Sequence, residues 1–123
     1  MTTPSFDTPN IAHALESMPS EAIDRLPFGV VRLSAKGGVT FYSKTEGRLS
    51  GYGDRPVLGR HFFDAIAPCM NTPSFRARIQ EEKRRGTLDF EFGHTGDFDD
   101  PARFVRVRVC SASDGGYWLL LSR

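Results

Sequence analysis

Alternation of apolar and polar residues dominates the second half of the chain. Leu88, Phe90 and Phe92 are separated by acidic residues, and residues 105–109 alternate valine with arginine. This period of two is typical of strands with one buried face. Residues 117–121 form an unbroken apolar run, which favours a strand nearer the centre of a sheet. The pattern therefore predicts three strands in this half of the chain, the last of them central.

Two further strands are predicted earlier in the chain. Residues 28–33 and 39–42 are rich in apolar residues, and the Ala-Lys-Gly-Gly sequence between them favours a tight turn. Residues 43–64 are interrupted by glycines, which indicates short helical pieces joined by turns. The order of elements predicts an α+β domain with a five-stranded antiparallel sheet and helices over one face.

The N-terminal segment has helical signals. Thr8 and Pro9 favour a helix start. An apolar stripe with helical spacing follows at Ile11, Leu15 and Met18. Short helices are marginal alone and depend on packing against something else. Residues 1–27 are therefore predicted to form a helical cap over part of the other face of the sheet, and residues 28–123 to form the core of the same single domain.

Two more helices are indicated by their ends. Ser20 can cap a second short helix that runs to Leu26. Thr72 and Pro73 open a longer helix that Gly86 closes. All of these helices are expected to pack against the sheet rather than to stand alone.

Composition indicates a folded domain, with 39% hydrophobic and 25% charged residues among 123. The 16 lysines and arginines against 15 acidic residues leave a net charge of +1. Nucleic-acid binding needs clustered positive charge, so no nucleic-acid partner is expected. The one basic run, residues 83–85, suits the C-terminal end of the predicted long helix.

Several classes of protein are disfavoured by what the sequence lacks. The N-terminus does not have the basic start and apolar core of a signal peptide, and no apolar run approaches the roughly 18 residues of a membrane span. Two cysteines are too few for a disulfide framework, and the three histidines show no metal-ligand spacing. Cys110 continues the arginine side of a predicted strand and is expected to have no functional role. A cytoplasmic protein without membrane contact or a metal site is expected.

Cys69 is the candidate of most chemical interest. It follows a mostly apolar stretch, directly after Pro68. Upstream, Tyr42, Glu46 and Ser50 recur every four residues, a spacing that places them on one side of a helix or helical turn. A thiol that can be acylated, together with polar groups that could hydrogen-bond the far end of the attached acyl group, suggests a covalently held ligand. The alternative is a buried structural cysteine and three unrelated polar residues.

These residues form a recognisable pattern. The strand order and residues 58–63 look like a PAS sensory domain. A narrower pattern consists of Tyr42, Glu46-Gly47, Ser50-Gly51 and Ala67-Pro68-Cys69. It resembles the photoactive yellow protein family of blue-light receptors, and the resemblance extends from Phe6 to Trp118, nearly the whole chain.

The resemblance implies a chromophore, 4-hydroxycinnamic acid (p-coumaric acid), attached to Cys69 as a thioester. It also implies that Tyr42 and Glu46 donate short hydrogen bonds to the buried phenolate, and that the Ser50 hydroxyl supports Tyr42. To donate, Glu46 must be protonated, so burial must raise its pKa well above the exposed value of about 4.3. The other expected pocket residues are Val31, Tyr52, Phe62, Ile66, Ala67, Pro68, Met70 and Phe98.

The resemblance also implies a mechanism. Light isomerises the chromophore from trans to cis, and Glu46 then passes its proton to the ring oxygen. The carboxylate left in an apolar pocket destabilises the fold, and the N-terminal cap, as the least stable part, loosens as the signal. Replacement of Glu46 by glutamine is expected to red-shift the absorption and to weaken the structural response.

Some positions depart from the family pattern. Tyr52 stands where the family commonly has arginine, and Met70 stands where a small polar residue is usual. Gly96 stands in place of an aromatic residue, Phe98 keeps a ring, and Asp100 stands where a methionine helps the dark state return. Slow recovery after illumination is therefore expected.

Two other functions remain open. The chain could be a PAS domain that senses a small molecule or redox state through Cys69 as a reactive thiol. A cysteine enzyme is disfavoured because His61 shows no nucleophile–base motif with that thiol. The favoured function is a signalling module, not an enzyme, acting as a monomer or weak dimer on an unknown downstream partner. Its ends fit a free-standing protein and an excised N-terminal module equally well.

Overall fold

The computed structural model describes residues 3–54, 56–67, 70–86, 88–95 and 102–123. At its centre lies one five-stranded sheet in the order β2-β1-β5-β4-β3, with every neighbouring pair antiparallel. The strands are β1 Gly29–Leu33, β2 Val39–Tyr42, β3 Asp89–Thr95, β4 Phe104–Ser111 and β5 Tyr117–Ser122. The predicted five-stranded antiparallel sheet is confirmed, and β5 takes the central position that its apolar run predicted.

Strand β3 is longer than the sequence pattern indicated. The apolar alternation of the sequence ends at Phe92, but residues 93–95 also pair with β4, as far as Thr95 opposite Phe104. The next position on the apolar side of the alternation is His94, which is not an apolar residue. The alternation therefore ends before the backbone pairing does, and the sequence pattern underestimates the strand.

In the described part of the chain, five helical segments surround the sheet. They are α1 Ile11–Glu16, α2 Ser20–Ile23, α3 Lys44–Ser50, the π-helical turn η1 Phe62–Ile66 and α4 Pro73–Arg84. Helix α4 begins as predicted, because the Thr72 hydroxyl accepts a hydrogen bond from the Phe75 backbone N–H at 3.2 Å. Helix α2 ends at Ile23, short of Leu26, and Ser20 is its first residue rather than its cap.

Helix α1 begins later than Thr8 and Pro9 predicted. Its N-cap residue is Asn10, which has a left-handed backbone with φ of 54°. Asparagine tolerates this conformation better than most residues do. The Thr8 hydroxyl instead accepts a hydrogen bond from the Ser5 backbone N–H at 2.8 Å. Thr8 therefore belongs to a turn before the helix.

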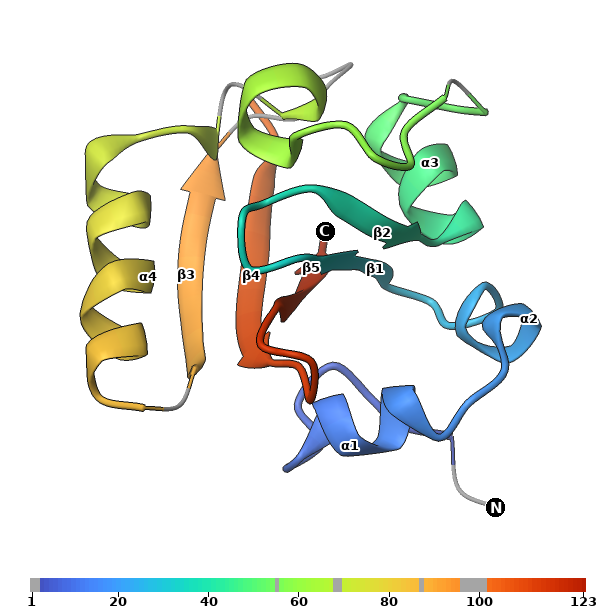
Figure 1. The fold of residues 1–123 in the computed structure, drawn as a ribbon. Helices are drawn as coiled ribbons and strands as arrows, with labels where there is room; N and C mark the ends of the chain where they lie inside the picture. Colours follow the sequence, from blue (N-terminus) through green and yellow to red (C-terminus); the bar gives the residue numbers. More distant parts are fainter. Residues whose placement is uncertain (1–2, 55, 68–69, 87, 96–101) are drawn as a thin grey trace.

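Both faces of the sheet are covered. Figure 1 shows α1 below the strands, α2 at their lower right, α3 and η1 above them, and α4 along the left side. Side chains of β5 alternate between the two faces. Leu119 and Leu121 belong to the core cluster with η1 and α4, whereas Trp118 and Leu120 belong to a second cluster with residues of α1 and α2. The N-terminal segment thus packs on the face opposite α4, as expected of a cap.

Glu16, at the end of α1, holds this cap to the sheet. Its carboxylate accepts hydrogen bonds from the Trp118 indole N–H at 3.2 Å and from the Ser113 backbone N–H at 3.1 Å. Arg32 on β1 forms an ion pair with it at 3.5 Å. One carboxylate therefore joins α1 to β1, to β5 and to the turn between β4 and β5.

A second attachment lies before α1. Arg108 on β4 donates hydrogen bonds to the carbonyl oxygens of Phe6 and Thr8 at 3.0 and 2.7 Å. Arg106 on the same strand forms an ion pair with Asp7 at 3.1 Å. Arg106 and Arg108 thus lie on the face of β4 that is turned toward the cap, and both bind the cap to the sheet.

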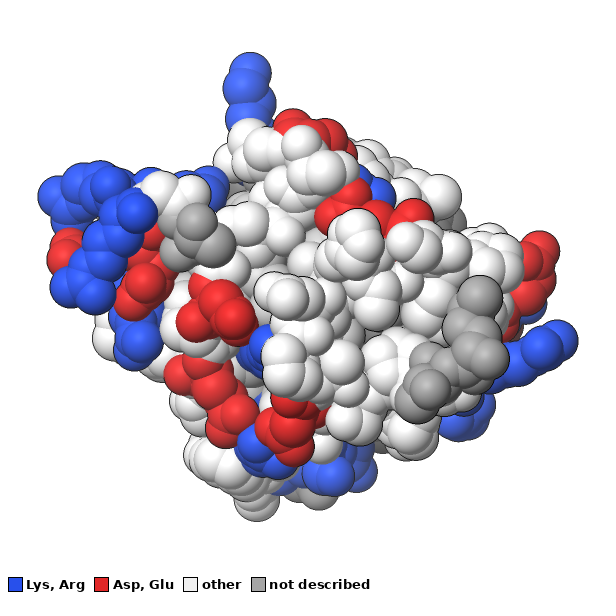
Figure 2. All heavy atoms as spheres, turned by 90° about the horizontal axis from the view of Figure 1, so that it is seen from below, with Lys and Arg blue, Asp and Glu red and all other residues white. Residues whose placement is uncertain are grey.

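Charges on this face of the molecule are mixed. Figure 2 shows acidic and basic side chains interspersed over it, with the densest basic group at one end. Arg84 and Arg85, in the basic run at the end of α4, both pair with Glu81, at 2.9 and 3.4 Å. The charges seen here are therefore balanced locally instead of forming one broad basic field.

Candidate functional site

Helix α3 carries two of the predicted site residues, and its start is fixed by Ser43. The Ser43 hydroxyl accepts hydrogen bonds from the Glu46 backbone N–H at 3.1 Å and from the Val30 N–H of β1 at 3.0 Å. Because Ser43 is the cap, Tyr42 ends β2 and lies outside the helix. The expectation that Tyr42 shares a helical turn with the other two residues is therefore wrong. Glu46 and Ser50 do lie one turn apart on α3, and both are buried.

The turn from β2 into α3 nevertheless brings the phenol to the helix. The hydroxyl oxygens of Tyr42 and Ser50 share a hydrogen bond at 3.4 Å. The Ser50 hydroxyl also accepts from the Tyr52 backbone N–H at 3.1 Å, and the Tyr52 and Tyr42 rings lie 5.9 Å apart. The Tyr52 hydroxyl donates to the Pro56 carbonyl oxygen at 3.2 Å. Ser50 thus contacts both tyrosines from the end of α3.

Tyr42 is held in its protonated form. Burial raises its pKa above the ordinary value, and the nearby charge of Glu46 raises it further. The hydrogen bond with Ser50 and the positive charge of Arg123 act in the opposite direction but do not cancel these effects. The phenol therefore remains available as a hydrogen-bond donor at neutral pH.

Arg123 is a site residue that the sequence analysis did not identify. Its Nη1 and Nη2 atoms donate to the two carboxylate oxygens of Glu46 at 2.7 and 2.9 Å. The side chains are 8% exposed for Arg123 and 4% for Glu46. A buried two-pronged pair of this kind is a strong, directional interaction. The sequence signal was an arginine two residues after the apolar run of the central strand.

Gly29, the first residue of β1, makes room for this ion pair. A Cβ atom at Gly29 would overlap Oε1 of Glu46. Gly29 lies opposite Leu121 in the β1–β5 ladder, so Arg123, the residue after the end of β5, follows just beyond this point. Gly29 at the start of β1 thus provides the space, and Arg123 just after the end of β5 provides the hydrogen-bond donors, for the Glu46 carboxylate of α3.

Several apolar residues that were expected in the site lie in the hydrophobic core. Val31, Tyr52, Phe62, Ile66 and Met70 belong to one buried cluster, against which Tyr42 and Ala67 pack. Residues on both sides of positions 68–69 are thus part of this cluster. Pro68, Cys69, Gly96, Phe98 and Asp100 lie outside the described residues.

Among the described residues, no helix is both long and apolar enough to cross a membrane. In the same part of the chain, no group of three or more histidine, cysteine, aspartate or glutamate side chains is arranged to hold a metal ion.

Comparison with known proteins first defines the class. The family model described as the PAS fold matches residues 17–122. The crystal structure of a PAS domain of an HTR-like protein from Haloarcula marismortui has a TM-score of 0.59 at 18% identity, covering 90% of this chain and 97% of that one. That likeness concerns the fold alone. The chain is a PAS domain, and the predicted fold class is confirmed.

Closer relatives define the family. Photoactive yellow protein of Rhodothalassium salexigens is 33% identical over 96% of this chain and 95% of its own length, and that of Rhodobacter capsulatus has the same three values. The crystal structure of the photoactive yellow protein domain from the sensor histidine kinase Ppr of Rhodospirillum centenum has a TM-score of 0.81. It is 33% identical and covers 91% of this chain and 99% of that domain. The chain belongs to the photoactive yellow protein family, which is a sensory photoreceptor family.

Proposed function

We propose that this chain is a blue-light receptor that carries p-coumaric acid as a thioester on Cys69. One observation supports this most directly. The hydroxyls of Tyr42 and Ser50 and the carboxyl of Glu46 converge beside a buried apolar cluster, in a chain of this family. This donor set suits a phenolic ring, which needs apolar walls and a hydrogen-bonded oxygen.

When bound, the chromophore supplies the light absorption and the trans-to-cis isomerisation. The chain's own residues do the rest. Tyr42, kept protonated by burial, donates to the phenolic oxygen, and Ser50 orients the Tyr42 hydroxyl. Glu46 holds the proton that moves to that oxygen after light absorption. Val31, Phe62 and Ile66 exclude water from the site.

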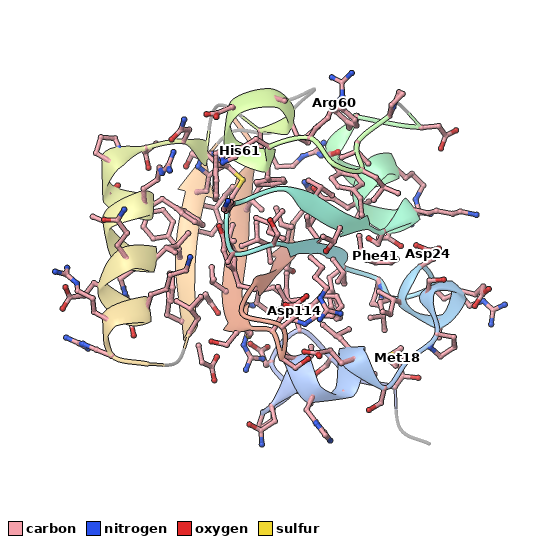
Figure 3. All side chains as sticks on the ribbon, viewed as in Figure 1. Met18, Asp24, Phe41, Arg60, His61 and Asp114 are labelled. Atoms are coloured by element: carbon pink, nitrogen blue, oxygen red, sulfur yellow. The ribbon has the colours of Figure 1, made fainter. Side chains whose placement is uncertain are left out.

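The route from Glu46 to the cap runs through the neighbouring residue on α3. The Thr45 hydroxyl donates to the carbonyl oxygens of Asp24 and Leu26, both at 2.8 Å. The Lys44 backbone N–H donates to the Asp24 carboxylate at 2.8 Å, and Asp24 lies at the end of α2 (Figure 3). When the proton leaves Glu46, the carboxylate can form both hydrogen bonds to Arg123. The accompanying shift of Glu46 would disturb the first turn of α3, to which the end of the cap is bonded. We propose that the cap loosens by this route and that a downstream signalling partner reads the change.

Reconstitution tests the proposal. The protein is incubated with activated p-coumaric acid, and a single adduct at Cys69 is expected by mass spectrometry, with a blue-absorbing band that bleaches in light and returns in the dark. The Cys69→Ser variant should carry no adduct, and Cys110→Ser should behave as the parent does. Glu46→Gln should red-shift the band and reduce the light-induced change in hydrogen exchange of residues 5–26.

The alternative function makes a different prediction. A PAS domain that uses Cys69 as a redox-sensitive thiol would be oxidised reversibly at Cys69 without needing Tyr42 or Glu46. That alternative would be favoured if the absorption band of the loaded protein did not respond to light while Cys69 could still be oxidised reversibly. Failure to form any adduct at Cys69 would contradict the photoreceptor proposal.

A further inference from the structure

The ion pair between Arg123 and Glu46 bears on the proton that the proposed function assigns to Glu46. Both nitrogens of the guanidinium fork are used, at 2.7 and 2.9 Å, and both side chains are buried. A protonated carboxyl group has one oxygen that carries the proton and accepts hydrogen bonds poorly. Glu46 therefore cannot keep both bonds to Arg123 and also donate a proton to a phenolic oxygen. The two arrangements compete.

Two other groups lie near Glu46 or near its helix. Tyr42 on β2 is close enough for the charge of Glu46 to raise the pKa of its phenol, and this side chain carries no positive charge. Arg103, which precedes β4, donates to the Leu49 carbonyl oxygen at 2.8 Å, one residue before the end of α3. Arg123 is a positive charge that directly contacts the Glu46 carboxylate at both oxygens.

The room for the pair is built into two strands. Gly29 on β1 leaves space for Oε1 of Glu46, which a side chain there would occupy. Side chains alternate between the two faces along a strand, so Arg123 falls on the same face as Leu119 and Leu121. This is the face of the sheet that packs against η1 and α4. The antiparallel register of β1 and β5 then sets the guanidinium beside the gap that Gly29 leaves.

We propose that Arg123 controls where the proton shared by Glu46 and the chromophore's phenolic oxygen rests, by stabilising the carboxylate form of Glu46. This inference rests on the proposed function. No atom is gained or lost: the proton lies either on Oε of Glu46 or on the phenolic oxygen, and Arg123 only biases the choice. In the loaded protein a fraction of the molecules in the dark therefore has the protonated phenol, which absorbs at shorter wavelength than the phenolate.

Unloaded protein provides the first test, independent of the chromophore. Carbon-13 NMR of labelled glutamate follows the ionisation of Glu46, with Glu46→Gln to assign the signal. Removing the cation in Arg123→Met should raise the pH midpoint of the Glu46 signal by about one unit or more, a tenfold change in proton affinity. Arg123→Lys should restore most of the effect because it keeps the charge. Arg84→Met, at an exposed ion pair on α4, is the matched control and should leave the midpoint unchanged.

Loaded protein provides the second test. The ratio of the short-wavelength band to the blue band is measured against pH in the parent, Arg123→Met and Arg123→Lys. The ratio of the short-wavelength band to the blue band should fall severalfold at neutral pH in Arg123→Met and stay near the parent value in Arg123→Lys. A Glu46 titration, or a band ratio, that is the same in the parent and in Arg123→Met would overturn the inference. Absence of an adduct at Cys69 would instead overturn the proposed function, while the unloaded titration would still decide whether Arg123 keeps Glu46 ionised.

Discussion

The indole N–H of Trp118 donates to the Glu16 carboxylate at 3.2 Å and so joins the central strand β5 to the N-terminal cap. The next residue along β5, Leu119, points to the other face and packs in the cluster that contains Val31 and Tyr52. One strand therefore contacts both the cap and the candidate site. A movement of β5 would therefore displace packed side chains on both faces of the sheet.

Replacement of Glu16 by alanine should weaken the attachment of the cap. It leaves the buried Trp118 indole N–H and the Ser113 backbone N–H without this acceptor, which should cost about 1–3 kcal/mol in the free energy of unfolding. Urea unfolding measures the loss, and hydrogen exchange of residues 5–26 locates it. Glu21→Ala, an exposed residue on α2, is the control and should change little. Equal stability of the two variants would show that Glu16 does not hold the cap.

The attachment should also depend on pH. Burial alone would raise the pKa of Glu16, but hydrogen bonds from Ser113 and Trp118 and the charge of Arg32 outweigh it and lower the pKa below its usual value of 4.5. A carboxyl group with a lowered pKa stabilises the fold above its usual pKa, and this stabilisation is lost as pH falls through the folded value.

Hydrogen exchange of the cap, corrected for intrinsic rates, should therefore be similar at about pH 7 and about pH 5.5 and become faster below about pH 4. The acid-induced change should be much smaller in Glu16→Gln, which has no carboxyl group to titrate at position 16. A cap that loosens equally in both proteins would assign the pH dependence to other carboxyl groups.

Much of the fold was predictable because local patterns determine it. The alternation of valine and arginine at 105–109 placed β4, and the apolar run at 117–121 placed β5 at the centre of the sheet. The start of α1 was not predictable from cap propensities, because Asn10 adopts a left-handed backbone and the Thr8 hydroxyl serves a turn.

The candidate site was only partly predictable. The grouping of Tyr42 with Ser50 followed from the family pattern, although a strand end and not a helix brings the phenol there. Arg123 was missed because its contact with Glu46 spans 77 residues and depends on the register of β1 with β5. The spacing of residues along the chain does not reveal this contact. The role of Gly29 in making room for Glu46 becomes visible only when β1 is paired with β5.

Cys110 should be chemically inert in the folded protein. Burial is the main cause that raises the pKa of its thiol to about 11, and the nearby carboxylate of Asp89 adds to this. At about pH 8 only roughly one molecule in a thousand would carry the thiolate that reacts with alkylating reagents. In a Cys69→Ser variant, iodoacetamide should therefore modify Cys110 only after unfolding. Rapid modification of the folded variant would contradict this prediction.

Loss of the Tyr42 hydroxyl should affect the loaded protein more than the unloaded one. Without chromophore, Tyr42→Phe loses only a 3.4 Å hydrogen bond with Ser50, so the free energy of unfolding should change by less than about 1 kcal/mol. With chromophore, it removes a donor to an ionised oxygen, and the pH at which the blue band bleaches should rise by about one unit. Tyr117→Phe, another buried tyrosine whose pKa is raised by burial, is the matched control for the spectrum.

A methyl group at position 29 should displace the Glu46 carboxylate. In Gly29→Ala the new Cβ would overlap Oε1 of Glu46, so the ion pair with Arg123 or the start of β1 must shift. Overpacking of this kind should cost about 1–3 kcal/mol in the free energy of unfolding. Gly38→Ala is the control, because its Cβ would meet the Ser34 hydroxyl oxygen at 3.4 Å, an ordinary contact.

A double-mutant cycle separates the overlap with Glu46 from a general effect on β1. If the carboxylate is the obstacle, Gly29→Ala should cost much less in a Glu46→Ala background than in the parent, with a coupling of about 1 kcal/mol or more. Urea unfolding of the four proteins gives this coupling energy directly. Strictly additive costs would mean that Gly29 is needed by the strand itself and not by the ion pair. The coupling is expected because the Glu46 carboxylate and Gly29 occupy adjoining space at the point where α3, β1 and β5 meet.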